Sequence, residues 1–242
     1  MVHKNILITG SNRGIGFQLC KQLSQLNTTG NIIATTRSGS NSCDLNRLSA
    51  VNKKIKVLAF DTTDYTRYDR FLDDCHRIVG NRGLNLLVNN AGVMARDSLM
   101  SVTPDSLNDN FNVNSIAPLM VTQKLLPLLK MSANYGDPTA VVNISSTLGS
   151  TVGRVEAGKQ YYPYRISKAS LNMITKLLAY DLSEDHIRVI AVHPGWVKTD
   201  MGSKQALLEP EFAVKSLLKV ILNIDSSLSG KLINYDGKVL QL

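Results

Sequence analysis

Tyr164 and Lys168 are the residues of this chain whose types and spacing first suggest chemistry. On a helix, side chains four residues apart lie on the same face, one turn from each other. A neighbouring ammonium stabilises a phenolate, so we expect Lys168 to lower the pKa of Tyr164 toward neutral pH. A phenol tuned in this way can donate a proton to a carbonyl oxygen or accept one from an alcohol. An exposed helix can carry the same pair without any function, so the pair needs supporting residues.

A glycine-rich turn near the N-terminus predicts a nucleotide-binding site. An apolar run over residues 5–9 leads into this turn, and Ile15, Leu19, Leu23 and Leu26 follow at helical spacing. Glycines let the backbone approach a ligand closely, and the N-terminus of the helix attracts a pyrophosphate. Ordinary tight turns and methyltransferase loops also use glycine, but the position between strand and helix favours a dinucleotide. The turn consists of Gly10, Ser11, Asn12, Arg13, Gly14, Ile15 and Gly16.

The residue that ends the second apolar run selects between the two nicotinamide dinucleotides. NAD-binding folds usually place an acid there for the ribose hydroxyls, whereas this chain has Arg37. A guanidinium can hold a 2′-phosphate that a carboxylate would repel, and Arg13 could supply a second positive charge. We therefore predict NADP(H) rather than NAD(H) as the cofactor. The alternative is that Arg37 only ends a strand in solvent.

Composition and charge exclude several classes of protein. The chain has 242 residues, 43% of them hydrophobic and 19% charged, which is ordinary for a globular protein. Its formal net charge is +8, but the basic residues are spread out and lack the runs and interleaved aromatic residues of a nucleic-acid site. No apolar run approaches the roughly 18 residues that span a bilayer. We therefore expect neither a nucleic acid nor a membrane as a partner.

The cysteines and histidines show neither disulfide nor metal-ligand spacing. Cys20, Cys43 and Cys75 are scattered and odd in number, which indicates a reducing compartment, and we predict the cytoplasm. The predicted first strand begins almost at the N-terminus and leaves no room for a signal peptide. We expect no metal site and interpret the four histidines as structural.

Short apolar runs that alternate with helical segments predict an α/β fold. Alternating strands and helices form right-handed crossovers and a mostly parallel sheet. We therefore predict one domain over residues 1–242, a Rossmann-type doubly wound sheet of about seven mostly parallel strands flanked by helices. Predicted loops over 149–160 and 199–210 each follow a strand, at the sheet edge where such folds bind ligands. The runs cover residues 5–9, 31–36, 55–60, 84–89, 140–145, 188–193 and 231–235.

Pro118 lies four residues after Asn114 in one helical segment. A proline lacks the N–H that would bond to the carbonyl of residue 114, so the helix should kink there. The freed Asn114 carbonyl could then bind a water molecule. The alternative is a kink that serves packing alone.

The order of motifs along the chain resembles that of the short-chain dehydrogenase/reductase family, in its compact branch. The match covers nearly the whole chain, and within the family it looks like the sniffer-type and C-factor-like carbonyl reductases. The family motifs are Gly10 to Gly16, Asp61 after the third run, Asn89-Asn90-Ala91-Gly92, Asn112-Val113-Asn114, Ser145-Ser146, Tyr164 with Lys168, and Pro194-Gly195 with Thr199. The branch is suggested by Asn12-Arg13-Gly14, the run 124–130, the run 193–202 and Asn234-Tyr235-Asp236-Gly237.

The resemblance implies a catalytic role for four residues. Tyr164 would protonate a carbonyl oxygen as hydride leaves the nicotinamide, while Lys168 would lower the tyrosine pKa and hold the nicotinamide ribose. Ser146 would hydrogen-bond the substrate oxygen, because the functional serine of the family is usually the second of this pair; Ser145 remains the alternative. A water on the Asn114 carbonyl would link Lys168 to solvent.

The resemblance also implies the remaining cofactor contacts. Asn90 and Ala91, followed by Gly92, would line the adenine ribose, and Asp61 and Thr62 would meet the adenine. Val197 and Thr199 would hold the carboxamide, next to Pro194 and Gly195. Asn89 is interpreted as a structural turn residue.

An NADPH-dependent carbonyl reductase is the leading hypothesis for the function. A nonenzymatic NADP-binding sensor or scaffold is the alternative, but such relatives typically lose the tyrosine or the lysine. Epimerases and dehydratases of the extended branch need more residues after Lys168 than this chain has, and the Gly-x-Ser-x-Gly elbow of many hydrolases is absent. Trp196, Tyr161, Tyr162 and Met201 suggest hydrophobic aldehydes, ketones or quinones as substrates. The oligomeric state is open; many relatives form homodimers through the helices that carry Asn114 and Tyr164.

Overall fold

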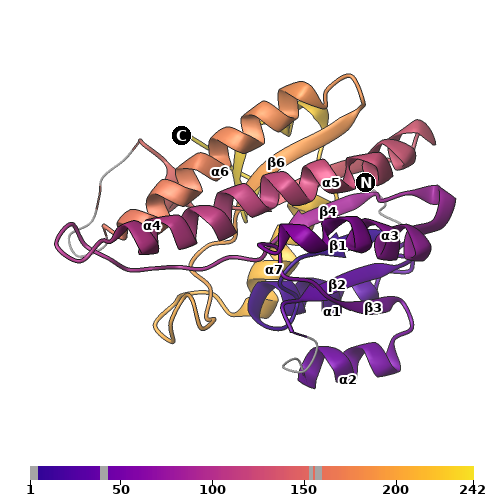
Figure 1. Ribbon diagram of the computed structural model, residues 1–242, viewed down its shortest axis with the longest axis horizontal. Coiled ribbons are helices and arrows are strands. Elements are labelled where there is room, and N and C mark those ends of the chain that lie inside the picture. The colour runs from indigo at the N-terminus through magenta and orange to yellow at the C-terminus, as the bar shows by residue number, and fades with distance from the viewer. Residues whose placement is uncertain (1–4, 39–42, 153–154, 156–159) are drawn as a thin grey trace.

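A mostly parallel sheet with helices on both faces forms the body of the molecule (Figure 1). The structure is a computed structural model that describes residues 5–38, 43–152, 155 and 160–242. Within these residues the sheet has eight strands in the order β3-β2-β1-β4-β5-β6-β7-β8. The strands are β1 (Ile6–Ile8), β2 (Ile32–Thr36), β3 (Ile55–Ala59), β4 (Leu86–Asn89), β5 (Thr139–Ile144), β6 (Ile187–His193), β7 (Leu232–Asn234) and β8 (Val239–Leu240).

The prediction of about seven mostly parallel strands in a doubly wound sheet is confirmed, with one strand added. All neighbouring strands are parallel except β7 and β8, which pair antiparallel. A tight turn at Gly237, with φ of 92°, returns the chain onto β7. Because β8 has only two residues, the sequence pattern did not reveal it.

The alternation of side chains along each strand divides the core into two layers. Ile6 and Ile8 of β1 belong to one apolar cluster and Leu7 between them belongs to the other. This is the two-residue period of a strand buried on both faces, which explains its continuous apolar run.

Helices from different parts of the chain cover the two faces. The cluster around Ile6 includes Leu19 of α1, Leu45 of α2 and Leu217 of α7, and the opposite cluster includes residues of α3 and α5. The helices are α1 (Gly14–Ser24), α2 (Cys43–Val51), α3 (Tyr68–Val79), α4 (Pro104–Phe111), α5 (Ala117–Asn134), α6 (Tyr162–Asp181) and α7 (Pro210–Ile221).

The helical segment predicted to kink at Asn114 contains a wider turn instead of a regular α-helix. A π-helical turn over Asn112–Ile116 lies between α4 and α5, and Pro118 follows it at the second position of α5. Pro118 has no N–H for the carbonyl of residue 114, which accounts for the loss of the α-helical pattern. Such turns frequently occur at functional sites.

The parallel strands bring the predicted motifs to one edge of the sheet. The glycine turn follows β1, Asn90 follows β4, Ser146 follows β5 and Pro194 follows β6. Residues 199–209 contain no helix or named strand, as predicted, and α7 begins at Pro210. Of the predicted loop 149–160, residues 153–154 and 156–159 lie outside the described residues.

The described residues contain neither a membrane-spanning helix nor a cluster of metal ligands. None of the helices in these ranges has both the length and the apolar character of a membrane span. No group of three histidine, cysteine or acidic side chains in the same ranges is arranged to hold a metal ion.

Candidate active site

Helix α6 carries Tyr164 and Lys168 one turn apart, as the sequence predicted, and buries both. Their exposed fractions are 7% and 5%. Lys168 Nζ donates a hydrogen bond of 2.8 Å to the carbonyl oxygen of Ile144 at the end of β5. The same Nζ lies 5.7 Å from the centre of the Tyr164 ring. Tyr164 and Lys168 are therefore buried and not exposed on the surface of the helix.

Burial, rather than the neighbouring lysine, controls the pKa of Tyr164. Desolvation raises this pKa to about 12, and a hydrogen bond with Ser146 acts weakly in the opposite direction. Desolvation also lowers the pKa of Lys168 to about 8. The expected net fall of the Tyr164 pKa is therefore wrong for this structure, because desolvation outweighs any stabilisation of the phenolate by Lys168, whose Nζ donates to the Ile144 carbonyl. At neutral pH Tyr164 carries its proton.

The two adjacent serines after β5 have different partners. Ser146 hydrogen-bonds with the Tyr164 side chain, and its Oγ accepts a bond of 3.1 Å from the Leu148 N–H. Ser145 instead donates a 2.6 Å bond to Oδ1 of the buried Asn172. The geometry therefore favours Ser146 for contact with a substrate and gives Ser145 a structural role.

The buried side chain of Asn114 connects three segments of the chain through hydrogen bonds. Its Nδ2 donates to the Val93 carbonyl at 2.8 Å and to Ser167 Oγ at 3.0 Å, while Oδ1 accepts from the Val93 N–H at 2.9 Å. Ser167 Oγ in turn donates to the Tyr164 carbonyl at 2.8 Å. The side chain of Asn114 therefore fixes the segment after β4 against the helix turn that carries Tyr164.

The sequence analysis did not identify Ser115 and Ser167, the two serines that complete these hydrogen bonds. Ser115 Oγ donates to the carbonyl of Ser167 at 2.8 Å, and neither serine is exposed. A signal for Ser167 was present, because it lies three residues after Tyr164 on the same helix and next to Lys168.

The glycine turn has the geometry of a phosphate cradle. Gly10 has a φ of 65°, and a Cβ there would lie 2.9 Å from Ala91 Cα. A Cβ on Gly16 would lie 2.3 Å from the Gly10 carbonyl oxygen, so only glycine fits. Helix α1 begins with Arg13 as its N-cap, and no side chain caps its first N–H groups. Uncapped N–H groups and the helix dipole suit a pyrophosphate, so these residues fit a dinucleotide.

Several residues of the predicted cofactor site hold the turn with their side chains. Asn90 Nδ2 donates to the carbonyls of Thr9 and Gly10 at 2.8 and 2.9 Å. Ser11 Oγ donates to the Ile8 carbonyl at 2.8 Å. Ala91 packs on Gly10, and a Cβ on Gly92 would lie 3.9 Å from Lys168 Nζ. The structure thus brings these residues, the glycine turn and the Tyr164 pair to the same edge.

The residues predicted to surround the adenine lie after β2 and β3. Arg37 is exposed and directly follows β2. Asp61 Oδ1 accepts hydrogen bonds from the N–H and the hydroxyl of Thr63, so this carboxylate orders its own turn. Thr62 is buried, and its carbonyl accepts a 2.7 Å bond from the Tyr68 hydroxyl.

Residues 196–209, which we call the strap, lead from β6 to α7. Val197 of the strap is buried and pairs with Leu208, while Thr199 packs against Gly14 of the glycine turn. Gly195, with a φ of 82°, and Pro194 precede the strap. Thr199 therefore lies beside the glycine turn, and Val197 is held two residues before it by its pairing with Leu208.

Asn89 and His193, which end β4 and β6, also lie at this edge. Asn89 was expected in a turn but ends strand β4, where its Nδ2 bonds to Thr122 Oγ1 at 3.1 Å and to Asn143 Oδ1 at 2.8 Å. It ties β4 to β5 and α5. Burial lowers the pKa of His193 to about 4, so this histidine is neutral and unsuited to proton transfer near neutral pH.

Comparisons with known proteins identify the family of the chain. A family model described as short chain dehydrogenase matches residues 4–208. The carbonyl reductase Sniffer of D. melanogaster has a TM-score of 0.95 and 34% identity, with 99% of each chain covered. An NADPH-bound carbonyl reductase from chicken fatty liver has a TM-score of 0.95 and 32% identity over 100% of both chains. The C-signal protein of Myxococcus xanthus is 34% identical over 155 residues, which are 64% of this chain and 90% of that protein.

The family model spans most of the sequence, and the two carbonyl reductases share the fold over nearly the full length of both chains. The chain therefore belongs to the short-chain dehydrogenase family of oxidoreductases.

Proposed function

We propose that this protein reduces a carbonyl compound to an alcohol with NADPH, and that Tyr164 donates the proton. The observation that carries the proposal is the buried, protonated Tyr164, which hydrogen-bonds with Ser146 and lies one turn before Lys168. A protonated phenol is the form that a reductase needs at the start of its reaction. Two structural relatives whose names include carbonyl reductase support the same activity.

The cofactor would lie along the carboxyl edge of the sheet. The glycine turn and the N-terminus of α1 would hold the pyrophosphate, and Arg37 and Arg13 would receive the 2′-phosphate. When bound, the reduced dinucleotide supplies a hydride. Toward the nicotinamide, Lys168 would hold the ribose, and the segment from Pro194 to Thr199 would hold the carboxamide. Asp61 and Thr62 would meet the adenine, and Asn90 and Ala91 would line its ribose, while Gly92, next to Lys168, would lie nearer the nicotinamide. The chicken relative is described as NADPH-bound, which supports the choice of NADP(H).

The residues of the chain then divide the remaining tasks. Ser146 Oγ orients the substrate carbonyl toward the Tyr164 hydroxyl, which donates its proton to the substrate oxygen. Lys168, charged below a pKa of about 8, stabilises the phenolate that this donation leaves behind. A water molecule held by the Asn114 carbonyl at the π-helical turn would return a proton from solvent.

The substrate we propose is a hydrophobic aldehyde, ketone or quinone. Trp196 and Met201 of the strap are 45% and 36% exposed, and Tyr161 and Tyr162 lie half-buried at the start of α6. Such side chains give apolar contacts beside the reacting groups. The free thiols Cys20, Cys43 and Cys75 are consistent with the cytoplasm as the compartment.

The test is oxidation of NADPH over a panel of aldehydes, ketones and quinones. We expect turnover with at least one carbonyl, and a loss of kcat of about 1,000-fold in Tyr164→Phe, because the proton donor is gone. Tyr180→Phe, on the exposed face of the same helix, is the matched control and should retain full activity. Tight NADPH binding without turnover on any carbonyl would favour the sensor hypothesis, and an active Tyr164→Phe would remove the assigned proton donor.

A further inference from the structure

A cavity of about 710 Å³ lies at the amino end of the sheet, away from the candidate active site. It is lined by the end of α6, by the starts of β6 and β7, and by β8. Its volume is in the range of small-molecule sites, which is roughly 300–1,000 Å³. The catalytic residues follow β5 and begin α6, at the opposite end of these elements (Figure 1). A ligand in this cavity would therefore leave the cofactor edge free.

The floor of the cavity is apolar and belongs to the sheet face that α6 covers. Leu232 of β7 pairs in register with Leu240 of β8 and with Ala191 of β6. Ile187 lies four residues before Ala191 on the same strand, so its side chain is on the same face. Ile187, Leu232 and Leu240 all line the cavity. Three neighbouring strands thus offer a continuous surface for a hydrocarbon chain.

The loop before β7 forms one wall of the cavity and is fixed by its backbone. Gly230 has a φ of 80°, and a Cβ there would lie 3.4 Å from Cβ of Ala179 on α6, so the loop approaches the helix closely. The Gly230 N–H donates to the Val189 carbonyl at 2.8 Å, and Ser229 Oγ accepts from the Val189 N–H at 3.1 Å. The cavity is therefore preformed on this side.

The rim of the cavity is basic. Four basic residues line it: Lys176, His186, Arg188 and Lys231. None of the described residues in the lining is acidic. Asp225 interacts electrostatically with Arg188, but its Oδ1 already accepts three hydrogen bonds from the turn that follows it. Within the part of the chain that the structure describes, the ammonium groups of Lys176 and Lys231 have neither a hydrogen bond nor an ion pair. Two unpaired cations therefore border the apolar floor.

We propose that this cavity is a second binding site, which takes an amphipathic carboxylate such as a fatty acid. The carboxylate would bind at Lys176 and Lys231, and the hydrocarbon chain would lie on Ile187, Leu232 and Leu240. An inorganic anion would leave the apolar floor unused, and a neutral hydrocarbon would leave the cations unused. The inference is independent of the proposed reductase function, because the two sites lie at opposite ends of the sheet.

The test is a titration with octanoate, followed through the amide chemical shifts of the whole protein. We expect saturable shifts around Gly230, Leu232 and Leu240. Octanol has the same chain without the charge and should bind about five-fold more weakly. Acetate has the charge without the chain and should give no saturable shift, because burial of the chain supplies most of the binding energy.

The double variant Lys176→Gln with Lys231→Gln tests the rim. It should weaken octanoate binding about five- to ten-fold and leave octanol binding unchanged, because only charge is removed. Lys215→Gln on α7, outside the cavity, is the matched control and should bind octanoate as the wild type does. All three lysines are exposed, so the substitutions leave the core intact.

Several outcomes would overturn the proposal. These are the absence of saturable shifts with octanoate, equal octanoate affinity in the double lysine variant, and shifts confined to the surroundings of Tyr164. Binding to phosphatidylserine vesicles without binding to octanoate would overturn it in favour of a membrane surface. Saturating NADPH should leave the octanoate affinity unchanged, and a strong loss would place octanoate in the active site instead. A protein that binds no NADPH would contradict the proposed function, whereas the octanoate titration would still test the cavity.

Discussion

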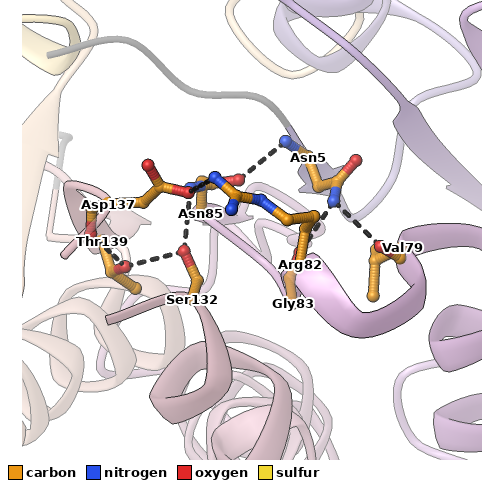
Figure 2. A network of polar contacts seen from close by, with 8 residues as sticks. All are labelled: Asn5, Val79, Arg82, Gly83, Asn85, Ser132, Asp137 and Thr139. Carbon is orange, nitrogen blue, oxygen red and sulfur yellow. Dashed lines mark hydrogen bonds and ion pairs between the residues drawn. The ribbon is translucent and has the colours of Figure 1, made fainter. Parts of the chain in front are cut away.

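The two ends of the parallel sheet bury the same kinds of polar side chain for different purposes. At the amino end, hydrogen bonds connect Asn5, Asn85, Ser132 and Thr139 in a continuous chain (Figure 2). Asn85 accepts from the Asn5 N–H at 2.9 Å and donates to Ser132 Oγ at 2.8 Å, and Thr139 donates to the same Oγ at 3.0 Å. This network joins β1, β4, β5 and α5 with neutral groups.

The carboxyl end buries groups that ionise. Tyr164 and Lys168 lie among Asn114, Ser145 and Ser146, and desolvation displaces the pKa of both from their ordinary values. A buried neutral network stabilises the fold once its hydrogen bonds are made, whereas a buried ammonium costs stability. The polar groups at the amino end therefore stabilise the fold, whereas the buried ammonium at the carboxyl end lowers its stability.

The largest effect should separate the two serines of the carboxyl end. Ser146→Ala removes a hydrogen bond to the charge that develops on the substrate oxygen, so kcat/KM should fall about 100-fold. Ser145→Ala leaves Oδ1 of Asn172 without its partner, so it should lower the free energy of unfolding by roughly 1–3 kcal/mol and keep most of the activity. Steady-state kinetics and urea denaturation of both variants distinguish these roles. A stable but inactive Ser145→Ala would exchange the two assignments.

At the amino end, Asn85→Ala should lower the free energy of unfolding without affecting catalysis. The substitution leaves the Asn5 N–H unpartnered, so the free energy of unfolding should fall by about 2 kcal/mol. The kcat of the folded protein should not change, because the network does not reach the carboxyl edge. Asn134→Ala, an exposed position at the end of α5, is the control and should stay within about 0.5 kcal/mol of the wild type. A loss of kcat in Asn85→Ala would break the proposed separation of the two ends.

Lys168→Met should reveal the cost of the buried ammonium through pH. The pKa of Lys168 is about 8 in the folded protein and ordinarily 10.5, so the unfolded chain binds more protons between these values. Stability of the wild type should therefore rise with pH through this window, by on the order of 1–2 kcal/mol relative to Lys168→Met from about pH 7 to about pH 9.5. Denaturation at several pH values measures this difference. Parallel curves for the two proteins would show that the ammonium carries no penalty.

The smallest effect concerns the charge that faces the cofactor. Arg37→Gln should reduce the preference for NADPH over NADH about five- to ten-fold, because it removes a cation from the 2′-phosphate. Binding of both dinucleotides by calorimetry measures the ratio. Arg47→Gln on α2, equally exposed, is the control and should leave the ratio unchanged. A wild type that prefers NADH would refute the cofactor assignment itself.

The sequence was sufficient for the parts of the fold and site that repeat in a regular pattern. Apolar runs located the parallel strands, and the spacing of Tyr164 and Lys168 placed them on one face of α6. The position of Pro118 was sufficient to predict a disturbed helix at Asn114, because a missing N–H has a local consequence.

Properties that depend on long-range packing were not predictable in the same way. The pKa of Tyr164 rises because α6 packs over β6 and over the short 3-10 helix Thr147–Gly149, whereas the local pair with Lys168 predicted a lowered pKa. Asn89 looked like a turn residue, but its partners Thr122 and Asn143 lie more than 30 residues away in the sequence. Strand β8 has only two residues, too few to show the alternation of apolar and polar side chains that identifies a strand.

The short strand β8 has a consequence for how two copies of the molecule can meet. An edge strand with free N–H and C=O groups invites another chain to extend the sheet. One edge here is β8, with only two residues, and the other is β3, which carries the exposed Lys56. Neither edge offers a long apolar template for intermolecular strand pairing. The exposed apolar side chains Ile166, Met173 and Leu177 lie instead on helix α6, so a helix face offers an apolar surface that the two sheet edges lack.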